Sequence, residues 1–282
     1  MEMASVSKQF TALSILALVD QDKLYLSDEV YGVFPYESFK DITIEQLINH
    51  SSGLNDAESA FFSEWDQDQL ASNEDILEWY SKENRKVNPP GEVYKYNNGA
   101  YEVLPAIVEK VSGQDFAQFV KKHVFEKAGM VNTNFYNLNQ PIDIKEKAFY
   151  YDQDSTGTWN QADGHFLTGV LGAGGVYTSA NDYYNYDQAL RQHSIFSEAT
   201  HDLIFKPSFE RENGSSYAMG WGVTDTAATH TGGWFGVNTY TKRYLNRPLT
   251  IAIFMNRATL FDDDLVAKAD SLVYHYVIGI DK

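Results

Sequence analysis

The sequence predicts an α+β fold, a single domain spanning residues 1–282 in which helices flank an antiparallel sheet. Helical patterns and turns fill roughly 40–205, which predicts a mostly helical lobe. The pattern then alternates with period two over roughly 215–257, which predicts strands, and a last helix is predicted over roughly 263–278. With 43% hydrophobic residues the chain can bury a large core, and no internal repeat or low-complexity linker divides it.

The predicted helices follow from apolar spacing and from their ends. Gln9–Val19 is apolar on nearly all sides, which is typical of a helix buried in the middle of a domain. A short helix over Thr43–His50 begins at a capping threonine and terminates in His50–Gly53. Further helices are predicted over Glu74–Glu83, over Ala100–Val111 with closure at Ser112–Gly113, and over about Gln114–Lys127.

The predicted sheet follows the helical lobe. Tyr217–Thr224, Val237–Arg243 and Leu249–Asn256 alternate with period two and are joined by tight turns, which predicts three antiparallel strands. A helix over Asp263–Ile278 closes the chain, and the acidic run Asp262–Asp264 suits the positive N-terminal end of that helix.

Charge and composition exclude several functions. The net charge is −17, without an extended Lys/Arg-rich run, so nucleic acid is not expected as a partner. Cysteine is absent, which excludes disulfides, thiolate catalysis and Cys-ligated zinc but leaves the compartment open. No apolar run approaches the length of a bilayer span and no signal peptide precedes Ser5, so we expect the chain as given to be soluble.

Ser5 and Lys8 form an S-x-x-K motif directly before the apolar helix. Three residues are almost one helical turn, so the lysine amine is expected beside the serine hydroxyl, where it could activate a nucleophile. Taken alone, the motif is better explained by Ser5 as an N-cap and Lys8 as a solvated side chain.

Two further motifs help to decide between these two interpretations of Ser5 and Lys8. Tyr96 and Asn98 form a Y-x-N in the turn-rich segment Pro90–Tyr101, just before a predicted helix, although a packed tyrosine would also explain the pattern. In His230-Thr231-Gly232-Gly233, small residues on a predicted strand would let a ligand approach the backbone, although H-T-G is also found in turns.

The order S-x-x-K, Y-x-N, H-T-G resembles the serine β-lactamase and penicillin-binding-protein superfamily. More narrowly, the chain resembles the class C β-lactamase-related branch, which includes esterases and D-amino-acid-specific peptidases. The resemblance runs from the first residues to the terminal helix, and its supporting matches are Ala4–Ala12, Asn49–Leu54 and Gly172–Ala180.

The resemblance implies a role for each motif residue. Ser5 would attack a carbonyl carbon and form an acyl-enzyme, with either Lys8 or Tyr96 accepting its proton. Asn98 would hydrogen-bond Lys8 and the substrate, and the amides of Ser5 and Gly233 would form the oxyanion hole. Tyr96 would then activate the water for deacylation.

The third motif departs from the β-lactamase pattern. His230 stands where those enzymes usually carry the lysine of K-T-G, and histidine is mostly neutral at pH 7. This favours the esterase and D-aminopeptidase relatives. Trp234 would wall the acyl pocket, or be a buried structural tryptophan, and Phe235 replaces a proline often seen there.

The beginning of the sequence also departs from the family pattern, in which a helix and two strands usually precede the nucleophile. Only four residues precede Ser5, so we expect the chain to lack that N-terminal portion. Three predicted strands would then leave an exposed sheet edge, which predicts a homodimer or aggregation by strand addition. Ser5 would also lose some of its support.

Other candidate sites are weaker. Asp152, Asp154 and Thr156-Gly157 faintly resemble a calcium loop, but the closing glutamate is missing and a hairpin turn is the preferred interpretation. The seven histidines are scattered without ligand spacing, and the 19 tyrosines are better explained by packing than by carbohydrate stacking. We therefore expect no metal and no cofactor.

These observations predict a serine hydrolase that cleaves a small ester, or an amide or peptide with a D-residue, through an acyl-enzyme. The expected partner is a small-molecule or peptide-like substrate. A non-catalytic protein of the same fold that binds peptide or cell-wall ligands is the second hypothesis, and a β-lactamase is the third. The compartment stays undetermined, although a periplasmic, cell-surface or secreted location agrees with the resemblance.

Overall fold

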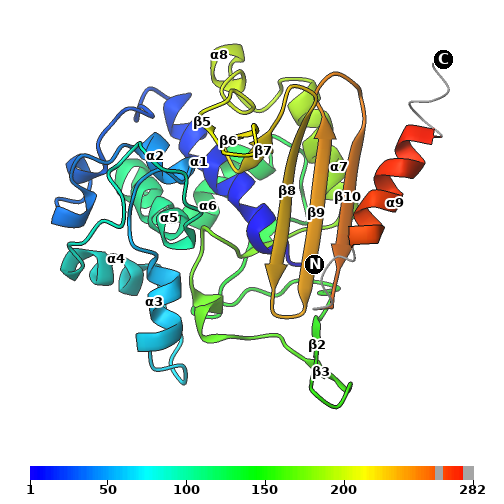
Figure 1. Ribbon diagram of the computed structural model, residues 1–282, viewed down its shortest axis with the longest axis horizontal. Coiled ribbons are helices and arrows are strands. Elements are labelled where there is room, and N and C mark those ends of the chain that lie inside the picture. Colours follow the sequence, from blue (N-terminus) through cyan, green and yellow to red (C-terminus); the bar gives the residue numbers. More distant parts are fainter. Residues whose placement is uncertain (258–262, 276–282) are drawn as a thin grey trace.

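The computed structural model describes residues 1–257 and 263–275. Its centre is an antiparallel sheet, with helices α1–α6 to one side of strand β8 and helix α9 beside strand β10 (Figure 1). This mixture of helices and one main antiparallel sheet confirms the predicted α+β class.

Helical segments precede and follow the strands of the main sheet in the sequence. The 3-10 and π turns are η1 (Ala4–Ser7), η2 (Val30–Gly32), η3 (Glu37–Phe39), η4 (Lys121–Phe125) and η5 (Phe166–Gly169). The α-helices are α1 (Lys8–Val19), α2 (Ile44–Ile48), α3 (Ala57–Glu64), α4 (Asn73–Lys82), α5 (Asn98–Ser112), α6 (Phe116–Val120), α7 (Ala180–Arg191), α8 (Glu198–His201) and α9 (Asp263–Val273). Local chemistry sets several ends: Thr43 and Gln46 form a capping box on α2, and Gly113 ends α5 in the left-handed conformation.

The main sheet has the order β10-β9-β8-β7-β6-β5, and all its pairs are antiparallel. Its strands are β5 (Phe209–Glu210), β6 (Ser216–Ala218), β7 (Trp221–Val223), β8 (Ala227–Trp234), β9 (Val237–Tyr244) and β10 (Thr250–Met255). Two small sheets pair β1 (Asn134–Phe135) with β4 (Val176–Tyr177), and β2 (Tyr151–Gln153) with β3 (Trp159–Gln161).

The prediction of one strand over Tyr217–Thr224 is wrong, because a turn divides this segment into β6 and β7. Met219 and Gly220 both have positive φ, 43° and 80°. A Cβ on Gly220 would lie 2.6 Å from the backbone nitrogen of Gln9, so the turn can approach α1 only with glycine here. The sheet therefore has six strands among the described residues instead of three.

Helix α1 is buried on all sides, as its composition predicts. Every residue from Lys8 to Leu18 is buried, including the large side chains of Phe10, Leu13 and Leu16. The helix packs against α5 and continues directly from η1, which carries Ser5. A core helix therefore holds the candidate nucleophile in place.

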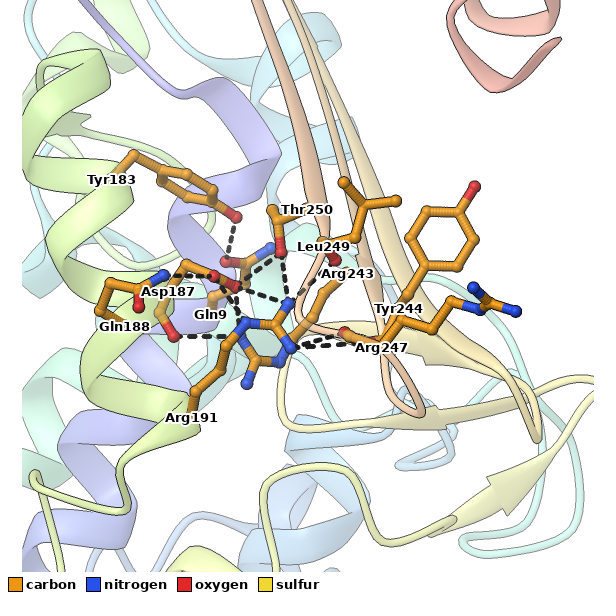
Figure 2. A network of polar contacts seen from close by, with 10 residues as sticks. All are labelled: Gln9, Tyr183, Asp187, Gln188, Arg191, Arg243, Tyr244, Arg247, Leu249 and Thr250. Carbon is orange, nitrogen blue, oxygen red and sulfur yellow. Dashed lines mark hydrogen bonds and ion pairs between the residues drawn. The ribbon is translucent and has the colours of Figure 1, made fainter. Parts of the chain in front are cut away.

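A polar network joins α7 to the β9–β10 hairpin (Figure 2). Asp187 on α7 pairs with Arg191, Nε to Oδ2 2.9 Å, and with Arg243 on β9. Its Oδ1 also accepts a hydrogen bond of 2.6 Å from Thr250 on β10. Arg191 donates to the backbone oxygens of Arg247 and Leu249, which fixes the hairpin loop against the helix.

Helix α9 contacts the opposite face of the sheet, where Lys242 of β9 and Asp270 form an ion pair of 2.8 Å. Two expected features of the last predicted helix lie outside the described residues. These are Asp262, in the acidic run at its N-terminal end, and the predicted end of the helix at Ile278. Within residues 1–257 and 263–275, no helix combines the length and apolar character that a bilayer-crossing segment needs.

The segment that resembles a calcium loop is the β2–β3 hairpin. Asp154 Oδ1 accepts hydrogen bonds from the Thr156 hydroxyl and from the backbone amides of Thr158 and Thr156, and the hydroxyl first, then these amides and Asn160, lower the pKa of Asp154 to about 2. The carboxylate thus organises the turn itself. Across the described ranges, no group of three or more His, Cys, Asp or Glu side chains is placed to hold a metal ion.

Candidate active site

Ser5 lies in η1, directly after an extended segment that runs beside β4. The amide of Met3 donates to the backbone oxygen of Val176 at 2.9 Å, which holds the segment in register. Ala4 then adopts φ 45°, which is unfavourable for a residue with a Cβ. This turn of the backbone places Ser5 at the border of the cleft instead of in the core.

Lys8 lies one turn after Ser5, and its side chain is fully buried. Its Nζ donates to Ser5 Oγ at 3.3 Å, to Asn98 Oδ1 at 2.7 Å and to the backbone oxygen of Ala173 at 3.0 Å. The ammonium also lies 5.0 Å from the centre of the Tyr96 ring. The solvated-lysine interpretation is therefore wrong for this residue, because Lys8 connects the serine to two segments that are distant in sequence.

The start of α5 places Tyr96 and Asn98. Asn97 is the N-cap: its side chain accepts from the amide of Ala100, while its own amide donates to Nδ1 of His50 at 3.2 Å. The rings of His50 and Tyr96 lie 4.2 Å apart, centre to centre. Among the described residues the Tyr96 hydroxyl has no hydrogen bond to Ser5 or Lys8, and the side chain borders the cleft.

Strand β8 forms the other wall of the cleft beside Ser5. Strand β7 pairs with β8 only at Ala228 and Thr229, so the stretch from His230 to Trp234 extends past it along η1. A Cβ on Gly232 would lie 2.6 Å from the backbone oxygen of Met3 and 3.0 Å from the amide nitrogen of Ser5. Glycine is therefore required where β8 meets the nucleophile.

His230 is buried and is fixed by two hydrogen bonds. Its Nδ1 lies 2.6 Å from the backbone oxygen of Thr231, which can only accept, so Nδ1 carries the proton. The Tyr217 hydroxyl then donates to Nε2 over 2.9 Å. Burial, and next the charge of Lys8, lower the pKa of His230 to about 3, so the imidazole is neutral at pH 7.

Two hollows meet at Ser5 and Gly233, which line both. The first is a cavity of about 140 Å³ on the side of Asn98, with Trp234 and the carboxyl side chains Glu2, Glu58 and Glu102 in its wall. The second is an open groove lined by Tyr96, His230, Thr231 and Arg211. The nine residues expected at the site, Ser5, Lys8, Tyr96, Asn98, His230, Thr231, Gly232, Gly233 and Trp234, thus lie around one cleft.

Comparison with known proteins identifies the family. The family model described as Beta-lactamase matches residues 1–274. The chain belongs to the Beta-lactamase family. This confirms the resemblance to serine β-lactamases and penicillin-binding proteins.

Among curated relatives, the chain is 32% identical to penicillin-binding protein 4* of Bacillus subtilis (strain 168), over 97% of this chain and 64% of that protein. It is 25% identical to a teichoic acid D-alanine hydrolase of Staphylococcus aureus, over 83% of this chain and 56% of that protein. The chain therefore spans less than two thirds of the length of either relative. A solved penicillin-binding protein of Bacillus halodurans shares the fold, with a TM-score of 0.84 and 24% identity over 96% of this chain and 85% of that one.

Four charged residues at this cleft were missed by the sequence analysis: Glu2, Glu58, Glu102 and Arg211. Glu102 lies one turn after Asn98 on α5, a spacing that could have revealed it. Glu58 on α3 accepts a hydrogen bond of 2.6 Å from Asn98 Nδ2, and Arg211 contacts the rings of Tyr94 and Tyr217. No local motif marks Glu58 or Arg211, because only the tertiary fold brings them to Ser5.

Two of the three carboxyls that line the first hollow, Glu58 and Glu102, influence each other. Burial raises the pKa of Glu58 and raises that of Glu102 well above its usual range, and repulsion between the two adds to the shift of Glu102. Glu102 is therefore the member that holds its proton more firmly. Glu2, deeply buried beside Tyr150 and Tyr177, has its pKa raised by burial to about 7.

Proposed function

We propose that this chain is a serine hydrolase that forms an acyl-enzyme on Ser5 and cleaves a small ester, or an amide or peptide with a D-residue. The observation that carries this proposal is the Lys8 amino group, which joins Ser5 Oγ to Asn98 Oδ1 beside the edge of β8. The names of the relatives, a penicillin-binding protein and a teichoic acid D-alanine hydrolase, agree with a D-residue substrate.

The residues present support a two-step reaction. Ser5 Oγ attacks the carbonyl carbon while its proton passes to Lys8 as a neutral amine, or to Tyr96 as a phenolate, and the amides of Ser5 and Gly233 stabilise the oxyanion. The tetrahedral adduct collapses, the bond to the leaving group breaks, and the leaving group takes up that proton. Water then adds to the acyl-enzyme while Tyr96 accepts its proton, and the second adduct collapses to release the acid as Ser5 Oγ takes up that proton.

The neutral state of His230 favours esters and D-aminoacyl compounds over β-lactams. Its Nδ1–H donates to Thr231 and its Nε2 accepts from Tyr217, so it offers no permanent positive charge to a substrate carboxylate. A β-lactamase of the K-T-G type relies on an ammonium there. A β-lactamase is therefore the less favoured candidate.

The test is intact-mass spectrometry after incubation with a fluorophosphonate and, separately, with a penicillin. We expect a stoichiometric fluorophosphonate adduct that disappears in Ser5→Ala, whereas Ser59→Ala, at an exposed serine, keeps it. An adduct with penicillin as well would favour the β-lactamase candidate. No adduct on a folded sample would contradict catalysis and favour a ligand-binding protein.

We also propose that the chain forms a homodimer through β10. This strand pairs only with β9 in the described part of the chain, and its sequence from Thr250 to Met255 is uncharged and rich in β-branched residues. Such an edge favours pairing with a second copy. Sedimentation velocity is expected to show dimers as concentration rises, and Ala252→Lys, which adds a charge on β10, should restore monomers. A monomer at every concentration would refute this proposal.

A further inference from the structure

An open groove of about 750 Å³ is lined by the end of α7, the segment from α8 to Lys206 and the β9–β10 hairpin. Among the described residues, its wall has none in common with the two hollows beside Ser5. Gly232, which meets Ser5, pairs with Thr239 near the start of β9, whereas Arg243 in the groove wall lies near the end of that strand. These two positions on β9 lie about 13 Å apart, so the groove is a separate site, at the end of the sheet where β9 turns into β10 (Figure 1).

The wall of this groove is positively charged, although the chain has a net charge of −17. Its cations are Arg191, Lys206, Arg243 and Arg247. Asp202 is the only acidic residue among its described lining residues. The whole chain has 39 acidic and 22 basic residues, so the groove reverses the charge balance of the chain. Concentrated positive charge of this kind attracts an anion.

Two of these cations, Arg191 and Arg243, share a single acidic partner. Both pair with Asp187 (Figure 2), and within residues 1–257 and 263–275 no second carboxylate lies within ion-pairing distance of either guanidinium. The Arg243 guanidinium lies 5.4 Å from the ring centre of Phe205, and its two hydrogen bonds to described residues both come from Nη1. The pair therefore keeps an excess positive charge, which an oxyanion in the groove would balance.

A buried histidine in the same wall has a ring nitrogen without a partner. His201 is only 5% exposed, and its Nε2 has no hydrogen-bond partner in the described part of the chain. Its ring is stacked on that of His193, 3.8 Å centre to centre. Burial, and next the charges of His193 and Arg243, lower the pKa of His201 to about 4, so the ring is neutral at pH 7. A buried polar atom without a partner is destabilising, so a ligand that bonds Nε2 would be stabilised.

The hydrogen-bonding capacity of these groups favours one kind of anion. A phosphate monoester or a diphosphate carries both P–O⁻ and P–OH near neutral pH, because its last proton has a pKa of about 6. It accepts from guanidinium groups, and it can satisfy His201 Nε2 in either tautomer, as acceptor or as donor. A carboxylate or a phosphodiester can only accept. The strongly negative chain is repelled by an anionic membrane, which favours a soluble ligand.

We propose that this groove binds a soluble phosphate monoester or diphosphate. Its oxyanions pair with Arg243, Arg247 and Lys206, and one of its oxygens bonds His201 Nε2. The site is distinct from the cleft at Ser5 and does not depend on the proposed hydrolase activity. Because its wall includes both α7 and the β9–β10 hairpin, the ligand also stabilises the junction between them.

The test uses pyrophosphate as the probe, in isothermal titration calorimetry and in thermal unfolding, with KCl of equal ionic strength as the salt control. We expect saturable binding, and a Tm that rises with pyrophosphate but not with KCl. Lys206→Gln and Arg247→Gln should each raise Kd by about fivefold or more. His201→Phe, which keeps a stacked ring but removes Nε2, should raise Kd as well. These three variants leave Arg191 and Arg243 in place.

The matched control is Lys40→Gln, at an exposed lysine outside the groove, which should bind pyrophosphate as the unmodified protein does. Arg211→Gln should also keep the binding, and its loss there would place the phosphate beside Ser5 and overturn the proposal. Equal binding by the three groove variants and the unmodified protein, or no response beyond that to KCl, would overturn it too. Binding to phosphatidic acid vesicles without binding to pyrophosphate would replace the soluble ligand with a lipid headgroup.

Discussion

Replacing Lys8 with methionine is expected to lower kcat/KM by about a thousandfold or more. Methionine has similar length and can occupy the buried channel, but it offers no donor. Ser5 Oγ, Asn98 Oδ1 and the backbone oxygen of Ala173 would all lose the amino group that now joins them. The serine would lose one of its two candidate proton acceptors, and the asparagine its fixed orientation. The measurement is the rate of ester hydrolysis together with the rate of fluorophosphonate labelling.

A comparison with Tyr96→Phe identifies the base. Phenylalanine keeps the ring that packs on His50 and removes only the hydroxyl. If Lys8 accepts the serine proton, labelling by fluorophosphonate should slow far more in Lys8→Met than in Tyr96→Phe. The exposed Lys40→Met serves as the control and should match the unmodified protein. Activity of Lys8→Met within tenfold of the unmodified protein would exclude Lys8 as an essential group.

Replacing Asp187 with alanine is expected to reduce the free energy of unfolding by about 3–5 kcal/mol. Asp187 is the shared acidic partner of Arg191 and Arg243 in Figure 2, and Arg243 is only 5% exposed. Arginine cannot release its proton in a protein, so the buried Arg243 and the half-buried Arg191 would both be left without a counterion. Thr250 would lose its acceptor as well, which would loosen the β9–β10 hairpin from α7. Urea unfolding measures the change.

The matched control is Glu78→Ala, which removes an exposed i,i+4 pair with Lys82 and should change stability by less than about 1 kcal/mol. Asp187→Asn keeps the shape of the side chain and some hydrogen bonds. Its free energy of unfolding is therefore expected to lie between those of Asp187→Ala and Glu78→Ala. If Asp187→Ala unfolds at the same urea concentration as Glu78→Ala, the network does not stabilise the fold.

The fold class and the contact between Ser5 and Lys8 were predictable because both depend on local periodicity. An all-apolar segment forms a buried helix, and residues three apart share a helical face. The division of Tyr217–Thr224 into two strands was not predictable from alternation alone. It depends on Met219 and Gly220 turning where α1 passes within van der Waals distance, which is a tertiary constraint.

Two charged residues of the cleft, Glu58 and Arg211, were also not predictable from the sequence alone. Sequence motifs pointed to the residues that would act on the substrate carbonyl, because S-x-x-K and Y-x-N are short and ordered. Glu58 and Arg211 lie on α3 and just after β5, and neither has a local pattern that relates it to Ser5. Their relevance follows from which elements pack together, and therefore from the structure.

Several contacts around the candidate nucleophile Ser5 join residues that lie far apart in the sequence. Lys8 bonds Asn98 across 90 positions and Ala173 across 165, and Thr239 holds the backbone of Met3 across 236. Contacts of such high sequence separation close long loops, and the entropic cost of closing those loops must be met before the contacts form, so we expect them to form late in folding. A partly folded chain would then carry an ordinary, unreactive serine. Under the proposed function, we expect acylation of Ser5 only after the cleft is complete.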